Sequence, residues 1–385
     1  MTPRRYQLKK EAAGVVMGHH PWIFRDTLSS AALVFRDGDL LKLVDGQNKV
    51  LGFGIYEADG AIAIRVLRRG ASPPDAKWVK AQLSAALEKR KALTATTDGV
   101  RLVNGESDGL PAVVIDRFGD TLVAQSYTRG SEALTRFAAT ALARELSIPN
   151  ILLVPAHRRR GSEQPPRALR GSPPDVARFT EDGVPFAADL AGGQKSGTYL
   201  DLRGLRRALR TAPLTGARVL NLFSYSGMIG RSVELAGASK IVQVDSSERA
   251  LAFARAHHIT DEAKHELVTA DVFEWLLAHA PEVPYDVVIV DPPAMTSNKQ
   301  QVPAVLAGYK KLYRAAAPLV KPSGLLIAAC CTSRIERALF EKTVTETIGG
   351  GFTKERDLSP EPDHPVGFPQ ADYLKILGFR RRAVR

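Results

Sequence analysis

The sequence predicts an α/β protein in which a doubly wound parallel sheet, closed by an antiparallel pair of strands, follows a β-barrel and a small α+β domain. Three observations support this prediction. From about residue 192, short apolar runs alternate with amphipathic segments, as strands and helices do around a parallel sheet. The first 70 residues instead carry strand-like runs joined by Asp-Gly turns. Hydrophobic residues make up 44% and charged residues 24% of the chain, as in an ordinary globular protein.

Length, charge and cysteine content limit the class of protein. The 385 residues suffice for two or three domains. The net charge of +12 favours a polyanionic partner such as nucleic acid, although an arginine-favouring genome produces the same excess. No apolar run reaches the roughly 20 residues of a membrane span, and no apolar stretch follows the basic N-terminus as in a secretory signal. The two cysteines are adjacent, and a pair of neighbouring cysteines is a poor structural crosslink, so we expect a protein of the reducing cytoplasm. Because no membrane span is found, we expect no membrane partner.

Residues 1–72 are predicted to form the β-barrel. Strand-like runs occupy Leu40–Val44, Val50–Tyr56 and Ala61–Leu67, with an Asp-Gly turn in each of the two gaps between them. Trp22 and Phe24 follow a turn upstream of these strands. We expect both aromatic side chains in the core of the barrel.

Residues 73–190 are predicted to form the α+β domain. Helices are expected over Asp75–Leu93 and Ser131–Leu146, with strands before and after the second helix. Residues 157–175 are rich in Arg, Pro, Gly and Ser and lack periodicity, which predicts a mobile loop. Five arginines in this loop are expected to contact nucleic-acid phosphates, although such a run is more often a solvated surface: Arg158, Arg159, Arg160, Arg167 and Arg170.

Residues 191–385 are predicted to form the doubly wound sheet. Its strands are expected at Arg218–Phe223, Lys240–Val244, Glu266–Thr269, Asp286–Val290 and Gly324–Ala329. Two more strands, within the C-terminal segments GFTKERDLS and DYLKILGFRR, are expected to close the sheet as an antiparallel pair.

The segment Tyr285–Ser333 carries a distinctive pair of reactive groups. A helix predicted over Gln301–Val320 separates two buried strands, so these strands should be parallel neighbours that end at the same edge of the sheet. The first strand ends in Asp291-Pro292-Pro293 and the second in Cys330-Cys331. A carboxylate and a thiol would then lie one strand spacing apart, roughly 5 Å between backbones.

Polar residues also end the three preceding strands. The small-residue turn Phe223–Gly227 lets a ligand approach a helix N-terminus, but it lacks the GxGxxG pattern of a dinucleotide site. Asp245 follows the second strand, where an acid binds ribose hydroxyls, and Asp271 follows the third, near an adenine amine. Each aspartate taken alone is more often a helix cap. The ordered set favours an adenosine without a phosphate tail, and S-adenosylmethionine fits best.

A thiol beside a carboxylate suits the methylation of a pyrimidine at C5. A thiolate that adds to C6 makes C5 nucleophilic enough to take a methyl group. A donor near N3 assists the addition, and a base later removes the C5 proton. We expect Cys331 to attack and Asp291 to hold the base. Because successive residues of a strand point to opposite faces, Cys330 is expected in the core.

Nearly the whole chain resembles the bacterial large-subunit ribosomal RNA cytosine-C5 methyltransferases that carry an N-terminal PUA domain, a small RNA-binding β-barrel. The resemblance rests on a set of segments that are specific in combination: Arg101–Phe118, Gln194–Arg203, Asn221–Gly227, Asp291–Pro293, Leu326–Thr332, Asp363–Val366 and Tyr373–Phe379. It implies a Rossmann-like class I methyltransferase fold for the last domain.

The resemblance also implies roles for individual residues. The S-adenosylmethionine site would be formed by Lys195, Tyr199, Asp201, Phe223, Ser224, Tyr225, Ser226, Gly227, Asp245, Ser246, Asp271, Asp291 and Pro292. Asp291 would also orient the target base, and Cys331 would be the nucleophile. The chain departs from the family pattern at Ala294-Met295, where the family has an aromatic residue, at Cys330 and Thr332, which replace serines, and at Met228-Ile229.

We therefore hypothesise an S-adenosylmethionine-dependent RNA methyltransferase that forms 5-methylcytosine in 23S ribosomal RNA. A homodimer is compatible with this hypothesis. One alternative is an RNA N-methyltransferase, in which the Asp-Pro-Pro motif binds an exocyclic amine and no thiol is required. Another is an RNA-binding or ribosome-assembly factor that keeps the cofactor pocket without activity. No metal site is expected, because His257 and His258 lack a matching set of carboxylates.

Overall fold

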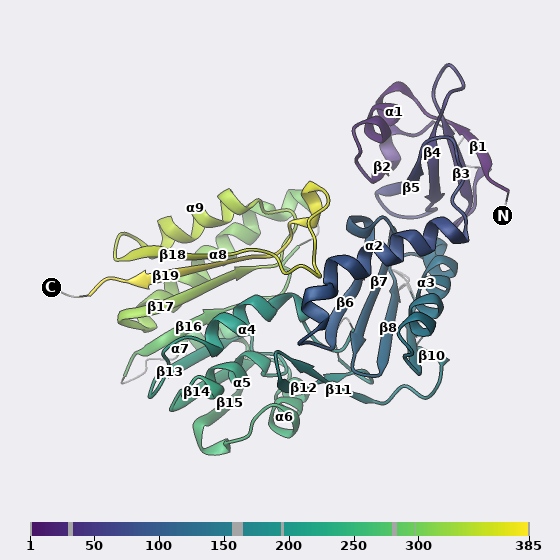
Figure 1. Cartoon of the computed structure of the whole chain (residues 1–385). Helices are drawn as coiled ribbons and strands as arrows, with labels where there is room; N and C mark the ends of the chain where they lie inside the picture. The colour runs from purple at the N-terminus through teal and green to yellow at the C-terminus, as the bar shows by residue number, and fades with distance from the viewer. Residues whose placement is uncertain are drawn as a thin grey trace. The chain divides into compact units, whose positions relative to one another are not determined.

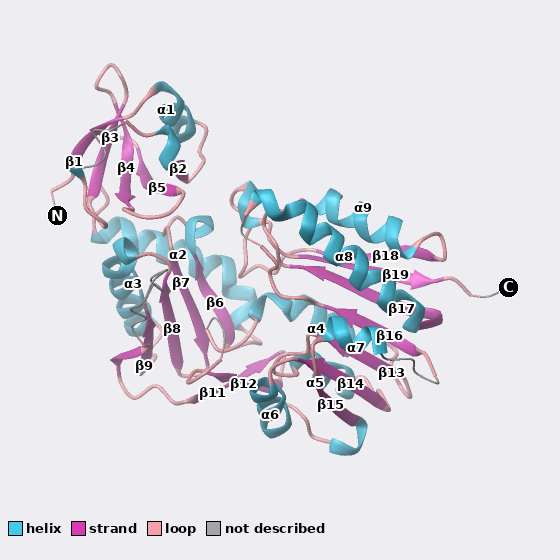
Figure 2. Ribbon diagram, turned by 180° about the vertical axis from the view of Figure 1, so that it is seen from behind, coloured by secondary structure: helices cyan, strands magenta, loops and turns pink. Residues whose placement is uncertain are grey.

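The structure, a computed structural model, describes residues 2–29, 34–155, 165–193, 196–278, 283–296 and 298–383. The chain divides into two units, one of Met1–Leu200 with Pro362–Phe368 and the other of Asp201–Glu361 with Pro369–Arg385. Figures 1 and 2 show the elements of both units from opposite sides. The predicted α/β class is confirmed. The predicted division into three domains, 1–72, 73–190 and 191–385, is not tested by these two units and stays a prediction.

The first sheet has five strands in the order β1-β3-β4-β5-β2. The helix α1 adds apolar residues to its core. These elements are β1 (Arg4–Gln7), α1 (Lys10–Met17), β2 (Trp22–Phe24), β3 (Leu40–Val44), β4 (Val50–Tyr56) and β5 (Ile62–Arg69). The three predicted hairpin strands are confirmed to within two residues at each end.

The expectation that Trp22 and Phe24 lie in the core is wrong. Both are half-buried, and the fully buried residue of β2 is Ile23 between them. Successive residues of a strand face opposite sides, so the two rings cannot share the core face with Ile23. Instead, Trp22 Nε1 donates to Glu106 Oε1 at 2.8 Å, and its ring centroid lies 4.8 Å from that of Phe368. Trp22 therefore ties the first sheet to other parts of the same unit.

The second sheet has the strand order β10-β9-β8-β7-β6, and α2 and α3 contribute to its core. The helix α2 begins where Asp75 accepts a hydrogen bond from Trp78 N at 2.7 Å. The elements are α2 (Ala76–Thr94), β6 (Gly99–Asn104), β7 (Val113–Phe118), β8 (Thr121–Ser126), α3 (Glu132–Glu145), β9 (Asn150–Val154) and β10 (Arg167–Arg170), followed by the hairpin β11 (Val176–Glu181) and β12 (Val184–Asp189).

The predicted mobile loop over 157–175 needs correction. Arg167–Arg170 forms β10, an edge strand that pairs antiparallel with β9. Arg167 donates to Glu132 Oε1 at 2.5 Å, so this arginine has a carboxylate partner within the protein. Four residues with two arginines carry no strand periodicity, and only the neighbouring strand defines them as a strand. Arg158, Arg159 and Arg160 lie outside the described residues.

The third sheet has seven strands in the order β15-β14-β13-β16-β17-β19-β18. The first five are parallel, and β19 and β18 close the sheet in antiparallel fashion, as predicted. The strands are β13 (Arg218–Leu222), β14 (Lys240–Asp245), β15 (His265–Thr269), β16 (Tyr285–Val290), β17 (Val320–Cys330), β18 (Phe352–Leu358) and β19 (Lys375–Arg381). The helices are α4 (Arg203–Arg210), α5 (Met228–Leu235), α6 (Glu248–His257), α7 (Val272–Ala278), α8 (Val302–Ala316) and α9 (Arg337–Ile348). In the described ranges, no helix is both long and apolar enough to cross a membrane.

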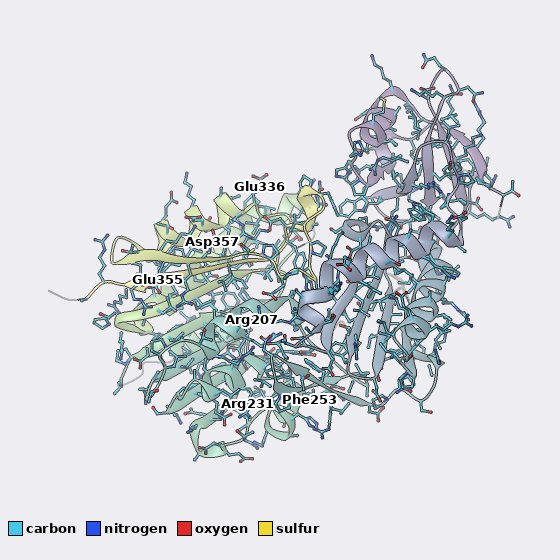
Figure 3. The ribbon with its side chains drawn as sticks, in the orientation of Figure 1. Arg207, Arg231, Phe253, Glu336, Glu355 and Asp357 are labelled. Atoms are coloured by element: carbon cyan, nitrogen blue, oxygen red, sulfur yellow. The ribbon has the colours of Figure 1, made fainter. Side chains whose placement is uncertain are left out.

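The outer strand β18 is blunted by charge. It carries the run Lys354–Asp357, of which Glu355 and Asp357 are labelled in Figure 3. Glu355 accepts two hydrogen bonds from Arg380 on β19, at 2.6 and 2.8 Å. Charged side chains on an edge strand hinder pairing with the sheet of another molecule, so the third sheet ends here.

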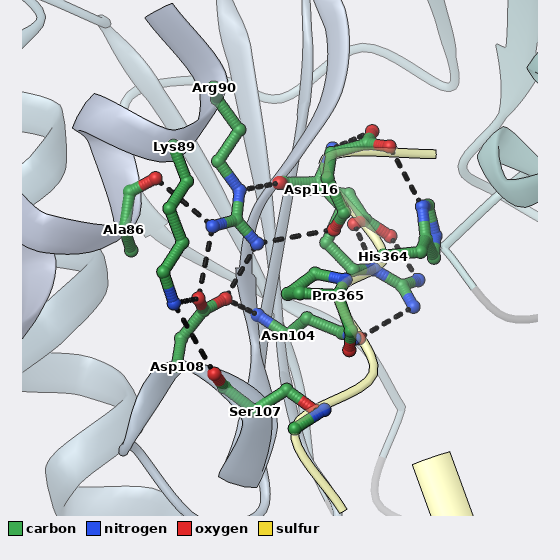
Figure 4. A network of polar contacts seen from close by, with 12 residues as sticks. Ala86, Lys89, Arg90, Asn104, Ser107, Asp108, Asp116, His364 and Pro365 are labelled. Atoms are coloured by element: carbon green, nitrogen blue, oxygen red, sulfur yellow. Dashed lines mark hydrogen bonds and ion pairs between the residues drawn. The ribbon is translucent and has the colours of Figure 1, made fainter. Parts of the chain in front are cut away.

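Residues 362–368 return from the C-terminal part of the chain to the first unit (Figure 4). Asp363 Oδ2 accepts from the amide of Arg101 at 3.1 Å, and its carbonyl accepts from Arg90 at 3.2 Å. His364 Nδ1 lies 2.9 Å from Asp363 Oδ1, and the amide of Gly367 donates to Ser107 Oγ at 3.2 Å. These contacts make the segment a structural part of the first unit.

Candidate active site

The candidate site lies at one edge of the third sheet, where five parallel strands end. Leu222 at the end of β13 is paired with Val244 of β14 on one side and with Val290 of β16 on the other. Val290 is paired in turn with Ala328 of β17. The residues that follow these positions therefore meet at a single rim, as the sequence predicts.

The turn after β13 has an unusual backbone. Phe223, Tyr225 and Gly227 all have positive φ angles, of 60°, 47° and 77°. Left-handed backbone costs a side chain other than glycine roughly 1 kcal/mol or more, so two such residues in one turn store strain. A Cβ atom on Gly227 would lie 2.7 Å from the Cβ of Ala254, which explains glycine at this position. Strain of this kind is typical of ligand-binding turns, and α5 begins directly after it.

Asp245 holds this turn in place. One carboxylate oxygen accepts from the amide of Tyr225 at 2.8 Å, and the other accepts from the amide of Ser247 at 2.9 Å. The amide of Ser224 also donates to the carbonyl of Val244 at 3.1 Å. The carboxylate that is predicted to bind ribose therefore stabilises the strained turn beside it, and its contact with ribose stays a prediction. Ser246 is exposed next to it.

His258 supports the same turn from the end of α6, and the sequence reasoning missed it. Its Nδ1 hydrogen-bonds to the carbonyl of Ser226, and its side chain is buried. The sequence offers only a pair of adjacent histidines on a helix, so no local signal distinguishes His258 from His257.

A buried polar chain lies under the turn. Asn221 Nδ2 donates to Gln243 Oε1 at 3.4 Å, and Gln243 Nε2 lies 3.1 Å from His265 Nδ1. His265 Nε2 lies 3.2 Å from Glu234 Oε2. Burial lowers the pKa of His265 below its ordinary value, although the charge of Glu234 opposes this. This series of hydrogen-bonded side chains comes from four elements and stabilises the sheet below the turn.

Two polar atoms at the turn keep unused hydrogen-bonding capacity. Ser224 Oγ and Asn221 Oδ1 are buried and have no hydrogen-bond partner in the described part of the chain. Buried polar groups in proteins are nearly always paired, so such atoms are expected where a ligand binds. The strained turn, the free hydroxyl of Ser224 and the carboxylate of Asp245 fit an adenosine-containing cofactor.

Asp271 is a helix cap in this structure. Its Oδ1 accepts from the amides of Phe273 and Glu274 at 2.9 and 3.1 Å, at the start of α7. The ring of Phe273 meets that of Phe223 edge to face, with centroids 6.2 Å apart. The common interpretation of such an aspartate thus holds, and its predicted contact with the cofactor stays a prediction.

The structure brings the thiol and the Asp-Pro-Pro motif together. Cys331 Sγ lies 3.5 Å from the carbonyl oxygen of Pro292 and donates to it. Cys331 is half-buried, whereas Cys330 is fully buried in the core of the sheet. Asp291, also half-buried, directly follows the neighbouring strand β16. The two strand ends thus present one carboxylate and one thiol at the rim, with the other cysteine packed inside.

The remaining predicted cofactor residues precede the first strand of the third sheet in the sequence. Asp201 is buried in the second unit, where its Oδ2 accepts from the hydroxyl of Tyr373 at 2.7 Å. Tyr199 belongs to the first unit, and Lys195 lies outside the described residues. For these residues, as for the rest of the predicted site, a direct contact with the cofactor stays a prediction.

Comparison with known proteins adds two family matches. Residues 113–380 match the S-adenosylmethionine-dependent methyltransferase family, and residues 7–69 match a PUA-like domain. A ribosomal RNA large subunit methyltransferase of Deinococcus radiodurans is 31% identical over 404 residues, covering 98% of this chain and 97% of that protein. Ribosomal RNA large subunit methyltransferase I of Escherichia coli is 33% identical over 393 residues, covering 98% and 99%.

Solved structures share the fold. A Streptococcus mutans protein assigned as a SAM-dependent methyltransferase superimposes with a TM-score of 0.83 at 21% identity, covering 98% of this chain and 100% of that one. A second structure, described as a methyltransferase complexed with SAH, gives a TM-score of 0.84 at the same identity and coverage. The match over two thirds of the chain, together with the relatives of equal length, shows that this protein belongs to the S-adenosylmethionine-dependent methyltransferase family, in its PUA-domain branch of ribosomal RNA large subunit methyltransferases.

Proposed function

We propose that this enzyme forms 5-methylcytosine in large-subunit ribosomal RNA, with Cys331 as the nucleophile. The observation that carries the proposal is the position of the Cys331 thiol at the end of β17, 3.5 Å from the Pro292 carbonyl of the adjacent strand end. A methyltransferase that acts on an amine needs no thiol at this place, whereas C5 methylation requires one. The similar proteins from Deinococcus radiodurans and Escherichia coli, which are named ribosomal RNA large subunit methyltransferases, support ribosomal RNA as the substrate.

The reaction divides among few residues. The Cys331 thiolate adds to C6 of a cytosine that has left its stack, while Asp291 holds the N3 edge of the base. S-adenosylmethionine supplies an electrophilic methyl group. C5 takes that methyl group, a base removes the C5 proton, and the thiolate leaves as the C5–C6 double bond returns. The turn at Phe223–Gly227 and the carboxylate of Asp245 would hold the cofactor.

RNA binding would draw on the charge of the chain and on the PUA-like domain. The net charge of +12 supplies contacts to phosphates, which position the RNA without reading its sequence. A ribosomal RNA substrate also corresponds to a cytoplasmic enzyme. Association into a homodimer stays a prediction, which light scattering checks.

Methyl transfer to large-subunit ribosomal RNA tests the proposal. We expect labelled 5-methylcytosine with the wild-type enzyme and a loss of at least about a thousandfold with Cys331→Ala, as for other covalent nucleophiles. The matched control is Cys330→Ala, which removes the buried neighbouring thiol and should keep most of the activity. Cofactor affinity, measured by calorimetry, should be the same in all three proteins.

A covalent trap makes the test more direct. RNA that contains 5-fluorocytosine has no C5 proton to lose, so the enzyme should stay attached to it through Cys331. A methylated purine that persists in Cys331→Ala would contradict the proposal and favour the N-methyltransferase alternative. Cofactor binding without any methyl transfer would favour the non-catalytic alternative.

A further inference from the structure

A buried lysine lies opposite the cysteine pair. Lys375, the first residue of β19, is paired in register with Cys330 at the end of β17. Its side chain is only 1% exposed. Lysine is rarely buried to this degree without a carboxylate partner, because desolvation of an ammonium group is costly. The described residues place no carboxylate within salt-bridge distance of its Nζ.

The ammonium group binds backbone carbonyls instead. Lys375 Nζ donates to the carbonyl of Thr332 at 3.1 Å and to that of Tyr373 at 3.2 Å. The carbonyl of Thr332 also accepts from the amide of Ile335 at 3.2 Å. Thr332 follows Cys331 directly and is buried itself. Lys375 therefore fixes the backbone at the point where the chain leaves β17 and presents the thiol of Cys331.

The charged and titratable groups around Lys375 come from several elements. Cys330 at the end of β17, Cys331 directly after it, Asp372 in the segment before β19 and Arg337 at the start of α9 all lie close enough to influence its charge. The carboxylate of Asp372 accepts a hydrogen bond from Arg337 at 3.3 Å. Burial lowers the pKa of Lys375 below its ordinary value, and the cysteines oppose that effect.

The other side of the cysteine pair is lined by phenols. Tyr309 and Tyr313 of α8 are buried against Cys330, and Asp291 adds charge near Tyr313. Burial raises the pKa of both tyrosines, so they stay neutral. Among these neighbours, Lys375 is the cation in contact with the backbone that carries Cys331.

We propose that Lys375 is a positioning residue for Cys331: its buried ammonium holds the Thr332 carbonyl, which fixes the thiol at the rim, and its charge favours the thiolate. The inference rests on the proposed role of Cys331 as the nucleophile. Lys375 touches neither the cysteine sulfur nor the reacting base in this account. It acts through the backbone and through its charge.

The reactivity of Cys331 toward iodoacetamide tests this inference without RNA or cofactor. The thiolate is the reactive form, so the rate reports both its exposure and its thiolate fraction. The background is Cys330→Ala, which leaves Cys331 as the single cysteine of the chain. In this background, Lys375→Met should slow alkylation at neutral pH by about tenfold or more and move its pH profile to higher pH. Lys375→Arg, which keeps a donor and the charge, should recover part of the rate.

A matched control lies on the same strand. Arg381, at the other end of β19, also donates to backbone carbonyls, those of Pro318 and Val320. Arg381→Met should leave the alkylation rate within about twofold of the background, since it removes a cation far along the strand from the thiol. Circular dichroism and the melting temperature show that each variant is folded.

Methyl transfer then separates this inference from the proposed function. Lys375→Met should lower kcat and leave KM for S-adenosylmethionine unchanged, because the cofactor turn is not touched. An alkylation rate unchanged in folded Lys375→Met, or lowered equally in Arg381→Met, would overturn the role of Lys375 and leave the function standing. Activity that survives in Cys331→Ala would instead overturn the function, whatever Lys375 does to the thiol.

Discussion

The rim of the third sheet and the cluster of Lys89, Arg90 and Asp108 in the first unit both bury polar groups, but they differ in how completely those groups are paired. In the cluster, all five N–H groups of Arg90 have acceptors: two are the carboxylate oxygens of Asp108, and three are backbone carbonyls (Figure 4). Asp108 accepts further from Lys89 and from the amide of Asn104. At the rim, Ser224 Oγ and Asn221 Oδ1 have no partner among the described residues, and Phe223 and Tyr225 adopt strained backbone.

This difference teaches that buried charge alone does not mark a functional site. The cluster has the more deeply buried ions, Arg90 and Asp108, yet every hydrogen-bonding atom of these two side chains has a partner, which is what a structural network requires. The rim combines strain with unused hydrogen bonds, both of which a ligand can relieve. The two regions should therefore respond differently to substitution, with stability changing in the cluster and cofactor binding changing at the rim.

The largest expected effect comes from breaking the cluster. Arg90→Met leaves the Asp108 carboxylate buried with the partly exposed Lys89 as its remaining charged partner, and should cost about 3–5 kcal/mol of unfolding free energy. Lys89→Met is the control, because its ammonium is half-exposed and should contribute about 0–1 kcal/mol. Urea unfolding measures both. Equal losses of unfolding free energy in the two variants would show that burial of the arginine does not make its ion pair with Asp108 stronger than that of Lys89.

A smaller effect is expected at the rim from Gly227→Ala. Its φ of 77° and the close approach to Ala254 should together cost about 1–3 kcal/mol of unfolding free energy. Gly216→Ala is the matched control, since Gly216 has a φ of 74° and nothing within 4 Å of an added Cβ. Calorimetry with S-adenosylmethionine should show weaker binding for Gly227→Ala alone. Weaker binding by both variants would remove the claim that this turn holds the cofactor.

The smallest expected effect is a loss of stability in acid that arises from one carboxylate. Burial works to raise the pKa of Asp108, but hydrogen bonds and charge from Arg90 and Lys89 hold it below its ordinary value of 3.8. The folded state therefore releases this proton more readily than the unfolded state does. Its contribution is fully present above about pH 4 and is lost as the pH falls through the folded-state pKa.

Urea unfolding between pH 7 and pH 3 measures this contribution. Asp108→Asn cannot titrate, so its stability should fall less steeply below pH 4 than that of the wild type. A matching slope in the two proteins would mean that other carboxylates account for the acid sensitivity.

Local patterns predicted the elements that are buried on both faces. The strands β13, β14 and β16, and β17 from Gly324 on, are rich in apolar residues, because helices cover both faces of a parallel sheet. The same reasoning failed for β10, an edge strand of four residues, and for Trp22, where alternation placed Ile23 in the core instead. Short edge segments carry too few buried positions for a pattern to appear.

The sequence by itself determined the order of the elements and the adjacency of the Asp-Pro-Pro motif to Cys331, because parallel neighbours must end at one edge of a sheet. Only the tertiary structure decided which side chains support that edge. His258 binds the carbonyl of a residue 32 positions earlier, and Lys375 binds one 43 positions away. Contacts over such separations depend on how the strands and helices pack, and they leave no periodicity in the sequence from which they could be predicted.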